Sequence, residues 1–211
     1  MNQVLIIYPK LFNVKTKFFR KLDFFLGNIK NYRLVYLSDC NNLLLDYSCE
    51  RKIEILQIAS YKDPGITHAI LFDDGEEFPA ELNYFISQDI PVRRVKVPIT
   101  RVINIDREDP RKYGQNYEYI GRLPHRPKDC PNWSNPYSLF DFPVNEEDEK
   151  PTREGVIAKY AYGFEHENLP TNLKKSDTLQ LMGKRLGCHC KPYPCHGDVI
   201  AAYLNSFDDG K

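Results

Sequence analysis

The sequence predicts an α/β protein in which a small parallel sheet, formed by residues 1–97, is followed by a compact α+β domain, formed by residues 98–211. In the first half, apolar runs of strand length alternate with segments of helical periodicity, as in proteins built from β-α-β units. Prolines then become frequent, with eight between residues 98 and 151. Regular periodicity returns after Thr152, so we expect an irregular, proline-rich opening to the second domain.

The first domain is expected to contain four strands, at 4–8, 33–37, 68–72 and 92–97, of which the first is an uninterrupted apolar run typical of a fully buried strand. Three intervening segments predict helices, at 18–29, 44–60 and 78–88. The middle helix is expected to end before the stop signal Asp63-Pro64-Gly65. Because parallel connections within one sheet are almost always right-handed, this order predicts right-handed crossovers.

The second domain is less regular in its pattern. Tyr117–Arg122 and Trp133 look like ordered structure inside the proline-rich segment, so we interpret that segment as folded rather than as a linker. Later residues predict a helix that begins near Thr152, a second helix over about 172–182, a short strand at 185–188 and a final helix over 198–207.

Charge and apolar run lengths exclude two classes of partner. Lysine and arginine number 29, as do aspartate and glutamate, so the formal net charge is zero. Nucleic-acid-binding proteins usually have a clear basic excess, which argues against that class. The apolar runs are too short to span a membrane, and the N-terminal residues carry no export signal. We therefore expect a cytoplasmic protein whose six cysteines are reduced.

A cluster of thiols and imidazoles is the strongest chemical signal, with three cysteines and two histidines between residues 188 and 196. Thiolate and neutral imidazole are the usual zinc ligands, and structural zinc takes four of them. One zinc set is Cys188, Cys190, Cys195 and His196. Alternatively, Cys130 or His125 from the proline-rich segment would complete the shell.

The same cluster has two interpretations without metal. The segment that begins at Cys195 lies at a predicted helix start, where free N–H groups favour anions and lower the pKa of a thiol. Cys195 with His196 would then be a nucleophile and its base, or His196, Gly197 and Asp198 would cradle an anion. The other interpretation is a tightly packed corner, with three sulfurs gathered beside an anion pocket.

Five ordered motifs in the second domain are similar to an uncharacterised domain family of bacteria, phages and large viruses. They are Tyr119-Ile120-Gly121-Arg122, Trp133-Ser134-Asn135-Pro136-Tyr137, Arg153-Glu154 with Tyr160, Gly183–Cys190 and Pro194–Val199. The resemblance covers about residues 101–205 and departs from the family pattern at Ser134, where the family has glycine, and at His189, where it has tryptophan.

The resemblance supplies a set of candidate binding residues: Arg122, Trp133, Asn135, Arg153, His196, Gly197 and Asp198. Arginine forks onto phosphate or carboxylate, an asparagine amide reads a base or sugar edge, and aromatic faces such as that of Tyr137 stack on rings. We therefore expect Arg122, Asn135, Arg153 and His196 to converge on one pocket for an anionic, ring-containing metabolite.

The first domain resembles the SLOG superfamily and the related nucleoside deoxyribosyltransferases, whose Rossmann-like parallel sheets bind nucleotides or nucleosides at the strand ends. Ser38 and Asp46 match positions of a small-residue loop in those families, and Glu81 aligns with their nucleophilic glutamate. The glycines of that loop are absent, which leaves a degenerate, structural domain as an equal alternative. Asp73 and Asp74 either bind ribose hydroxyls or form a turn and cap a helix.

Together these features predict a protein that recognises a nucleotide or nucleoside. The resemblances imply a phage, viral or bacterial N-glycoside hydrolase or glycosyl-transfer enzyme with Glu81, Cys195 and His196 as catalytic residues, in the host cytoplasm if the protein is viral. The alternative is a non-enzymatic, zinc-stabilised binding module that acts on a host component. No cofactor other than zinc is indicated, and a homodimer is one option for the assembly.

Overall fold

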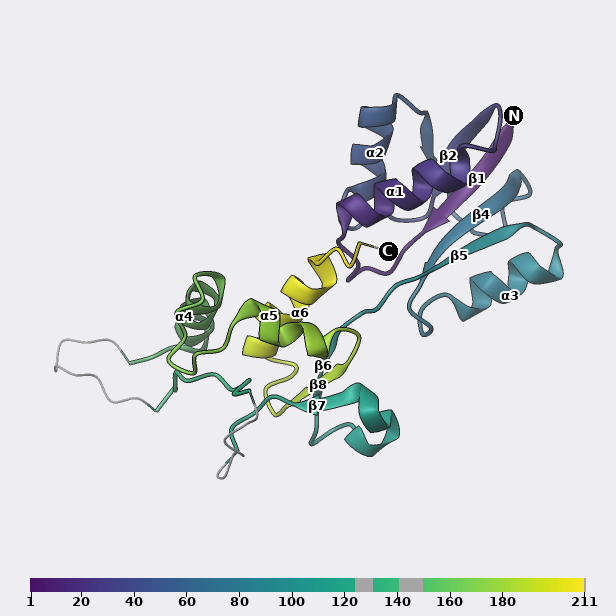
Figure 1. Ribbon diagram of the computed structural model, residues 1–211. Helices are drawn as coiled ribbons and strands as arrows, with labels where there is room; N and C mark the ends of the chain where they lie inside the picture. The colour runs from purple at the N-terminus through teal and green to yellow at the C-terminus, as the bar shows by residue number, and fades with distance from the viewer. Residues whose placement is uncertain (124–130, 141–149, 211) are drawn as a thin grey trace. The chain divides into compact units, whose positions relative to one another are not determined.

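The computed structural model describes residues 1–123, 131–140 and 150–210 and confirms the α/β class (Figure 1). Two compact units divide these residues: Met1–Pro98 with the described residues from Asn205 onward, and Ile99–Leu204. Within the described ranges, no helix combines the length and the apolar character that a bilayer crossing requires.

The first unit is built on a parallel five-stranded sheet with the order β3-β2-β1-β4-β5. Its strands are β1 (Asn2–Ile7), β2 (Tyr32–Tyr36), β3 (Ile55–Gln57), β4 (Ile66–Asp73) and β5 (Val92–Lys96). The central strand, β1, is deeply buried: Val4, Leu5 and Ile6 are at most 1% exposed. A strand that is covered on both faces needs such an uninterrupted apolar run.

Three helices cover this sheet: α1 (Lys15–Leu26) and α2 (Leu43–Arg51) on one face, and α3 (Pro79–Ser87) on the other (Figure 1). On the face that α3 covers, Leu5 of β1 and Leu71 of β4 belong to the same buried cluster as Phe85 of α3. On the opposite face, the Phe18 ring of α1 stacks on Phe72 of β4 with the ring centroids 4.9 Å apart. Consecutive residues of a strand point to opposite faces, so one apolar run fills both layers.

The predicted helix over residues 44–60 is wrong in its second half. The helix α2 ends at Arg51 because Lys52 adopts the left-handed conformation, with φ 55° and ψ 45°. Residues 55–57 then form β3, which pairs in parallel with β2. The sheet consequently has five strands rather than the four that the apolar runs predict.

The second unit contains a parallel three-stranded sheet with the order β6-β8-β7. Its elements are β6 (Arg101–Asn104), the 3-10 helix η1 (Pro110–Asn116), β7 (Tyr117–Tyr119), α4 (Arg153–Glu165), α5 (Lys175–Thr178), the 3-10 helix η2 (Leu179–Leu181), β8 (Arg185–Cys188) and α6 (His196–Ser206). The helix expected over about 172–182 is therefore two short pieces, and its first expected residue, Asn172, has φ 55°.

The core of the second unit joins α4, α6 and the sheet. Ile120, Trp133, Tyr160, Leu186 and Ile200 belong to it, each at most 2% exposed. The strands β7 and β8 are parallel, so their carboxyl ends lie at the same edge of the sheet. The motif Tyr119–Arg122 continues from the end of β7, and the motifs Gly183–Cys190 and Pro194–Val199 include and follow the end of β8.

Candidate functional site

A cavity of about 410 Å³ lies beside the carboxyl ends of β7 and β8. Residues of five chain segments line it: Tyr119–Arg122 from the last residue of β7 onward, Asn135–Phe140, the first turns of α4, Cys188–Cys190 from the last residue of β8 onward, and His196 at the start of α6. Ligand sites in parallel sheets commonly occupy this edge, and the volume lies within the range of small-molecule sites.

The structure brings Arg122, Asn135, Arg153 and His196 together, because all four residues line this cavity. They come from sequence positions that are up to 74 residues apart, and the parallel pairing of β7 with β8 brings together the segments that carry Arg122 and His196. Their roles in binding stay predictions.

The Arg122 guanidinium is held by main-chain oxygens. Its Nη2 donates to Tyr137 O at 2.8 Å and to Asn135 O at 3.3 Å, and its Nε donates to Asn135 O at 3.3 Å. Among the described residues, no carboxylate pairs with it. The positive charge is thus fixed in place and is not neutralised by these neutral carbonyl groups.

Arg153 is the first residue of α4 and is half-buried. Its Nη1 lies 3.4 Å from Pro194 O, and its guanidinium carbon lies 5.3 Å from the centroid of the Tyr193 ring. In the part of the chain that the structure describes, Arg153 also has no carboxylate partner. The cavity therefore has two arginines in its wall, and none of the lining residues within the described ranges is an aspartate or a glutamate.

The segment that contains Asn135 is ordered by its own side chains. Asn135 Oδ1 accepts a hydrogen bond from Tyr137 N at 3.0 Å, which forms a turn and presents the Tyr137 ring to the cavity. Lys159 Nζ lies 4.7 Å from the centroid of that ring, so a further cation lies near this wall. Apolar contacts come from Val156 and Ile157 on α4.

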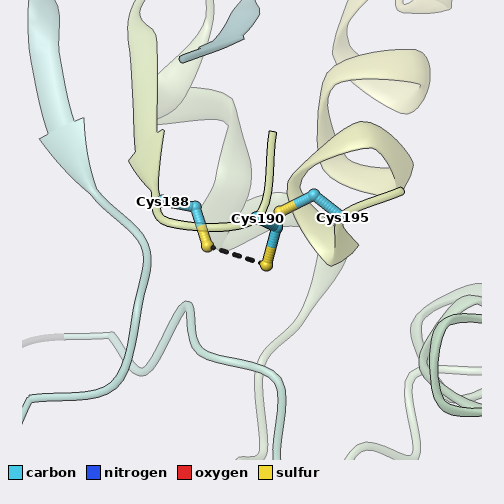
Figure 2. A group of neighbouring side chains, drawn as sticks. All are labelled: Cys188, Cys190 and Cys195. Atoms are coloured by element: carbon cyan, nitrogen blue, oxygen red, sulfur yellow. Dashed lines mark hydrogen bonds between the residues drawn. The ribbon is translucent and has the colours of Figure 1, made fainter. Parts of the chain in front are cut away.

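Three thiols meet at one corner of the cavity, where Cys188, Cys190 and Cys195 point toward one another (Figure 2). Their sulfur atoms all lie within 4.8 Å of one another, and Cys188 Sγ is 3.4 Å from Cys190 Sγ. Cys188 and Cys190 also line the cavity, whereas Cys195 is completely buried. This group of three cysteines could hold a metal ion.

The three thiols do not ionise equally. Hydrogen bonds from the thiols of Cys188 and Cys195 lower the pKa of Cys190, and Arg153 lowers it further. Hydrogen bonding to the other two sulfurs, together with burial, raises the pKa of Cys195. The thiolate character of the cluster is therefore concentrated at Cys190, on the side that faces the cavity.

His196 is adjacent to the thiol of Cys195 and is 4% exposed. Its Nε2 is 3.1 Å from Ile120 O, which fits a neutral ring that donates from Nε2, and burial lowers its pKa. The other ring nitrogen, Nδ1, is then an acceptor 3.7 Å from Cys195 Sγ. The buried hydroxyl of Tyr160, whose ring packs against His196, has no hydrogen-bond partner among the described residues.

Gly197 and Asp198 have structural contacts. A Cβ at Gly197 would lie 2.5 Å from Ile120 Cδ1, so glycine lets the start of α6 pack closely against the Ile120 side chain, which would have to shift for a larger residue. Asp198 Oδ2 accepts a hydrogen bond from Cys195 N at 3.0 Å, and its Oδ1 lies 2.6 Å from Lys191 Nζ. Neither residue lines the cavity.

Other predicted site residues lie elsewhere. Trp133 is 2% exposed in the core, where its Nε1 donates to Glu118 Oε1 at 3.1 Å, so its face is not available for stacking in the cavity. Glu81 lies in the first turn of α3 in the first unit. Cys130 and His125, the alternative metal ligands, lie outside the described residues.

Asp73 and Asp74 adopt the turn geometry that was one of their two interpretations. Asp73 Oδ1 accepts a hydrogen bond from Gly75 N at 2.9 Å, and its other oxygen pairs with Arg94. Asp74 Oδ1 accepts hydrogen bonds from the main-chain nitrogens of residues 76 and 77. These contacts order the loop that leads into α3.

Several lining residues were not predicted as site residues, namely Tyr119, Gly121, Ser138, Leu139, Phe140, Val156 and Ile157. Tyr119 is the last residue of β7, and a position at the carboxyl end of a parallel strand was the signal that could have identified it. Val156 and Ile157 look like core positions of an amphipathic helix, so periodicity alone does not separate them from the core.

Comparisons with known proteins confirm the two resemblances. Residues 1–103 match the family model described as Minimal SLOG domain, and residues 103–206 match Domain of unknown function (DUF4326). The chain is also similar to an "Uncharacterized 12.4 kDa protein in nrdA-td intergenic region" of Enterobacteria phage T4, with 41% identity over 54 residues. That match spans 26% of this chain and half the length of the phage protein. No solved structure matches the chain. The Minimal SLOG match indicates a nucleotide-related function.

Proposed function

We propose that the protein binds a small, anionic, ring-containing ligand of the nucleotide or nucleoside class in the cavity of the second unit. The observation that carries the proposal is the charge of the cavity wall: Arg122 and Arg153 line it, and among the residues that the structure describes no aspartate or glutamate does. Inside a recessed site, fixed cations without counter-charges attract phosphate more strongly than they would in open water.

The shape and the apolar part of the wall support a ring next to the anion. Tyr119 and Tyr137 offer aromatic faces or edges, and Val156 and Ile157 add aliphatic surface. A volume of about 410 Å³ is large enough for a mononucleotide and too small for a folded nucleic acid. The zero net charge of the chain agrees with a small ligand.

Binding without covalent catalysis through Cys195 is the simplest use of this site. Cys195 is 0% exposed and its pKa is raised, so neither access nor ionisation favours it as a nucleophile. Glycosyl transfer by Glu81 stays a hypothesis, since Glu81 lies in the first unit and is not part of this cavity wall. The proposed function is therefore recognition of the ligand.

Calorimetric titration of the full chain with nucleoside monophosphates and with the matching nucleosides tests this proposal. We expect a nucleotide to bind and its nucleoside to bind at least tenfold more weakly, because the phosphate contacts are lost. Arg153→Gln should weaken nucleotide binding by a similar factor. Arg111→Gln is the matched control, since Arg111 is an exposed arginine of the same unit that does not line the cavity.

Two results would contradict the proposal. One is equal affinity for the nucleotide and its nucleoside, which would remove the phosphate from recognition. The other is unchanged nucleotide binding by Arg153→Gln, which would locate the ligand elsewhere. Circular dichroism of each variant checks that the fold is retained.

A zinc-stabilised binding module is the second candidate function, and the thiol cluster favours it. A tetrahedral zinc ion with Zn–S bonds of about 2.3 Å separates its sulfur ligands by roughly 3.8 Å. Cys188 Sγ and Cys190 Sγ are 3.4 Å apart, and His196 Nδ1 lies 3.7 Å from Cys195 Sγ. The sulfur separations fit three thiolate ligands, since all three sulfur atoms lie within 4.8 Å of one another. His196 does not lie within that distance of all three, so its ring, which Ile120 O holds through Nε2, would have to shift to become the fourth ligand.

Elemental analysis of the purified full chain tests this second candidate. We expect about one zinc ion per chain, lost in Cys188→Ser and kept in Cys49→Ser, whose exposed thiol lies in the first unit. A chelator should then lower the unfolding temperature of the wild type, because metal binding contributes to folding. Metal-free protein whose unfolding temperature does not respond to a chelator would rule the zinc site out.

A further inference from the structure

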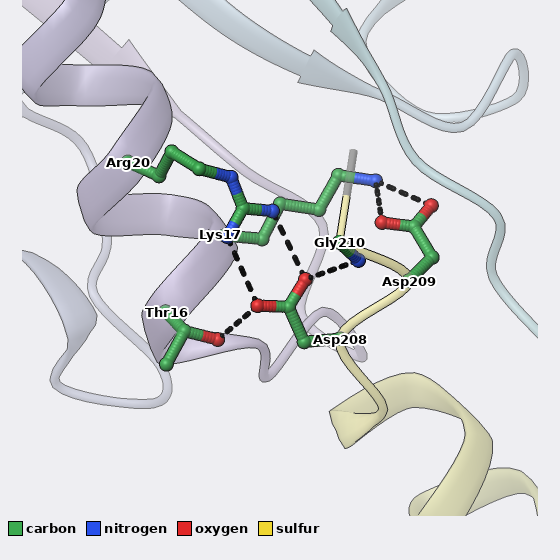
Figure 3. A network of polar contacts seen from close by, with 6 residues as sticks. All are labelled: Thr16, Lys17, Arg20, Asp208, Asp209 and Gly210. Carbon is green, nitrogen blue, oxygen red and sulfur yellow. Dashed lines mark hydrogen bonds and ion pairs between the residues drawn. The ribbon is translucent and has the colours of Figure 1, made fainter.

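The segment after α6 brings two acidic side chains onto α1 within the first unit. We call residues 207–210 the acidic tail. Three donor atoms of α1 form hydrogen bonds to the Asp208 carboxylate (Figure 3). Thr16 Oγ1 donates to Oδ2 at 2.5 Å, and Arg20 Nη1 and Nη2 donate to Oδ2 and Oδ1, each at 3.0 Å. Such a two-point arginine contact is also the standard recognition of phosphate.

Asp209 forms an ion pair with the buried ammonium group of Lys17. The side chain of Lys17 is 5% exposed, and its Nζ donates to both carboxylate oxygens of Asp209, at 2.9 and 3.0 Å. A buried ammonium group without an anion is costly, so this position requires a negative partner. Thr16, Lys17 and Arg20 lie within one and a half turns of the same helix, and together they form a preorganised anion cradle.

The first turn of α1 supplies no negative charge of its own. It contains no acidic residue, and its N-cap, Val14, makes no side-chain capping hydrogen bond. The partial positive charge at a helix N-terminus favours an anion at this position. Asp208 and Asp209 of the acidic tail therefore supply the negative charge that acidic residues in the first turn of a helix usually supply.

A basic cavity continues from the cradle. Its volume is about 240 Å³, and Lys17, Lys21, Arg94 and Lys96 line it. Arg94 pairs with Asp73, but Lys21 and Lys96 have no carboxylate partner in the described part of the chain. The positive surface therefore extends beyond the two tail carboxylates, which do not neutralise all of it.

We propose that Thr16, Lys17, Arg20 and the adjoining lysines form an anion site for a phosphate group, and that the acidic tail is its built-in competitor. A phosphate dianion offers oxygens for the Arg20 fork, the Thr16 hydroxyl and the Lys17 ammonium, as the two aspartates do. Either the tail or a phosphate occupies the cradle, because both use the same donors. The site is separate from the cavity of the proposed function.

Thermal unfolding of the full chain in inorganic phosphate, with sodium chloride at the same ionic strength as reference, tests the proposal. The test variant is Asp208→Asn with Asp209→Asn, which removes both negative charges at nearly constant shape. Without phosphate its unfolding temperature should fall below that of the wild type. With phosphate it should rise by about 2–4 °C more than the wild type does, because the vacated cradle binds the ion.

Matched variants assign the gain to the cradle. Arg20→Gln, added to the double variant, should abolish the extra gain, and Arg51→Gln should leave it, since Arg51 is equally exposed at 40% but lies on α2. The gain should persist in Arg153→Gln, which separates it from the cavity of the second unit. If the double variant does not fold, Asp208→Asn alone frees the Arg20 fork and keeps the ion pair of Lys17.

The outcomes are decisive in both directions. No extra gain in the tail variants, or a gain that survives Arg20→Gln, would overturn the proposal. AMP at the same concentration distinguishes the sources of the phosphate: a gain with inorganic phosphate alone identifies a free anion, and a gain with both identifies the phosphate of a larger ligand. Either of these two results supports the site.

Discussion

At Gly197, helix propensity and steric crowding have opposite effects on the free energy of unfolding of an alanine variant. In a helix, alanine is favoured over glycine by about 1 kcal/mol. A Cβ at Gly197 would, however, lie 2.5 Å from Ile120 Cδ1 and 3.1 Å from Val102 Cγ2, and overpacking typically costs about 1–3 kcal/mol. The difference of the two effects predicts that Gly197→Ala lowers the free energy of unfolding by up to about 2 kcal/mol, as measured by urea denaturation.

Gly155→Ala in the first turn of α4 is the matched control for that variant. The nearest atom to its added Cβ is Thr152 Oγ1 at 3.2 Å, at the end of a small side chain. Its effect on the free energy of unfolding should be smaller than that of Gly197→Ala. A Gly197→Ala protein as stable as the wild type would mean that α6 approaches Ile120 less closely than the structure has it.

Asp208 is the residue whose pKa reports tail docking. Hydrogen bonds from Arg20 and then from Thr16 lower its pKa below the usual value of about 4. A carboxyl group with a depressed folded-state pKa stabilises the fold above the unfolded-state pKa, and this stability is lost as the pH falls through the folded-state pKa. The tail contact should therefore persist at pH 5 and disappear only in strong acid.

Carbon-detected NMR titration of the Asp208 carboxyl measures that pKa directly. The groups that face it are Arg20, Thr16 and the main-chain N–H of Gly210, with the Lys17–Asp209 pair beside them. Arg20→Gln should return the pKa toward the ordinary range. A wild-type value near 4 would show that the tail is not docked on α1 in solution.

At the scale of the elements, an aromatic stack joins α1 to the sheet of the first unit. The Phe72 ring of β4 lies 4.9 Å from the Phe18 ring and 5.2 Å from the Phe12 ring, and Phe72 is completely buried. Truncation of such a side chain leaves a cavity, so Phe72→Ala should cost about 3–5 kcal/mol in urea denaturation. Phe24→Ala on α1 is the control, because Phe24 is 71% exposed and should cost little.

A small loss of stability in Phe72→Ala would contradict the packing of α1 on β4. A large loss of unfolding free energy would show that the aromatic stack fixes α1 on the sheet. Because Thr16, Lys17 and Arg20 lie on α1, the same stack would then also fix their positions in the anion cradle. The element and the site would then depend on the same buried contacts.

The elements also show what periodicity can and cannot predict. The strands β1, β2 and β4 are found because their buried stretches are uninterrupted apolar runs. The short strand β3 was missed because Leu56 and Gln57 are exposed at the edge of the sheet, where no apolar pattern is needed. The end of α2 depends on the left-handed conformation of Lys52, which lysine rarely adopts and which its side chain does not signal.

At the scale of the whole molecule, the candidate site depends on strand order. Arg122 and His196 could be predicted to meet only from a resemblance, because the order β6-β8-β7 that unites them leaves no local trace in the sequence. The contact of Thr16 with Asp208 spans 192 residues and was not predicted for the same reason. Trp133 was expected at the site, but an aromatic residue within a motif serves the core equally well.

The structure of the full chain in complex with the nucleotide that calorimetry selects is the most direct test of the proposed function. We predict that the phosphate lies within hydrogen-bonding distance of Arg122 or Arg153 and that the base or sugar lies against Tyr119, Tyr137 or Ile157. Nucleotide density found only at the cradle on α1, with the second-unit cavity empty, would contradict the account.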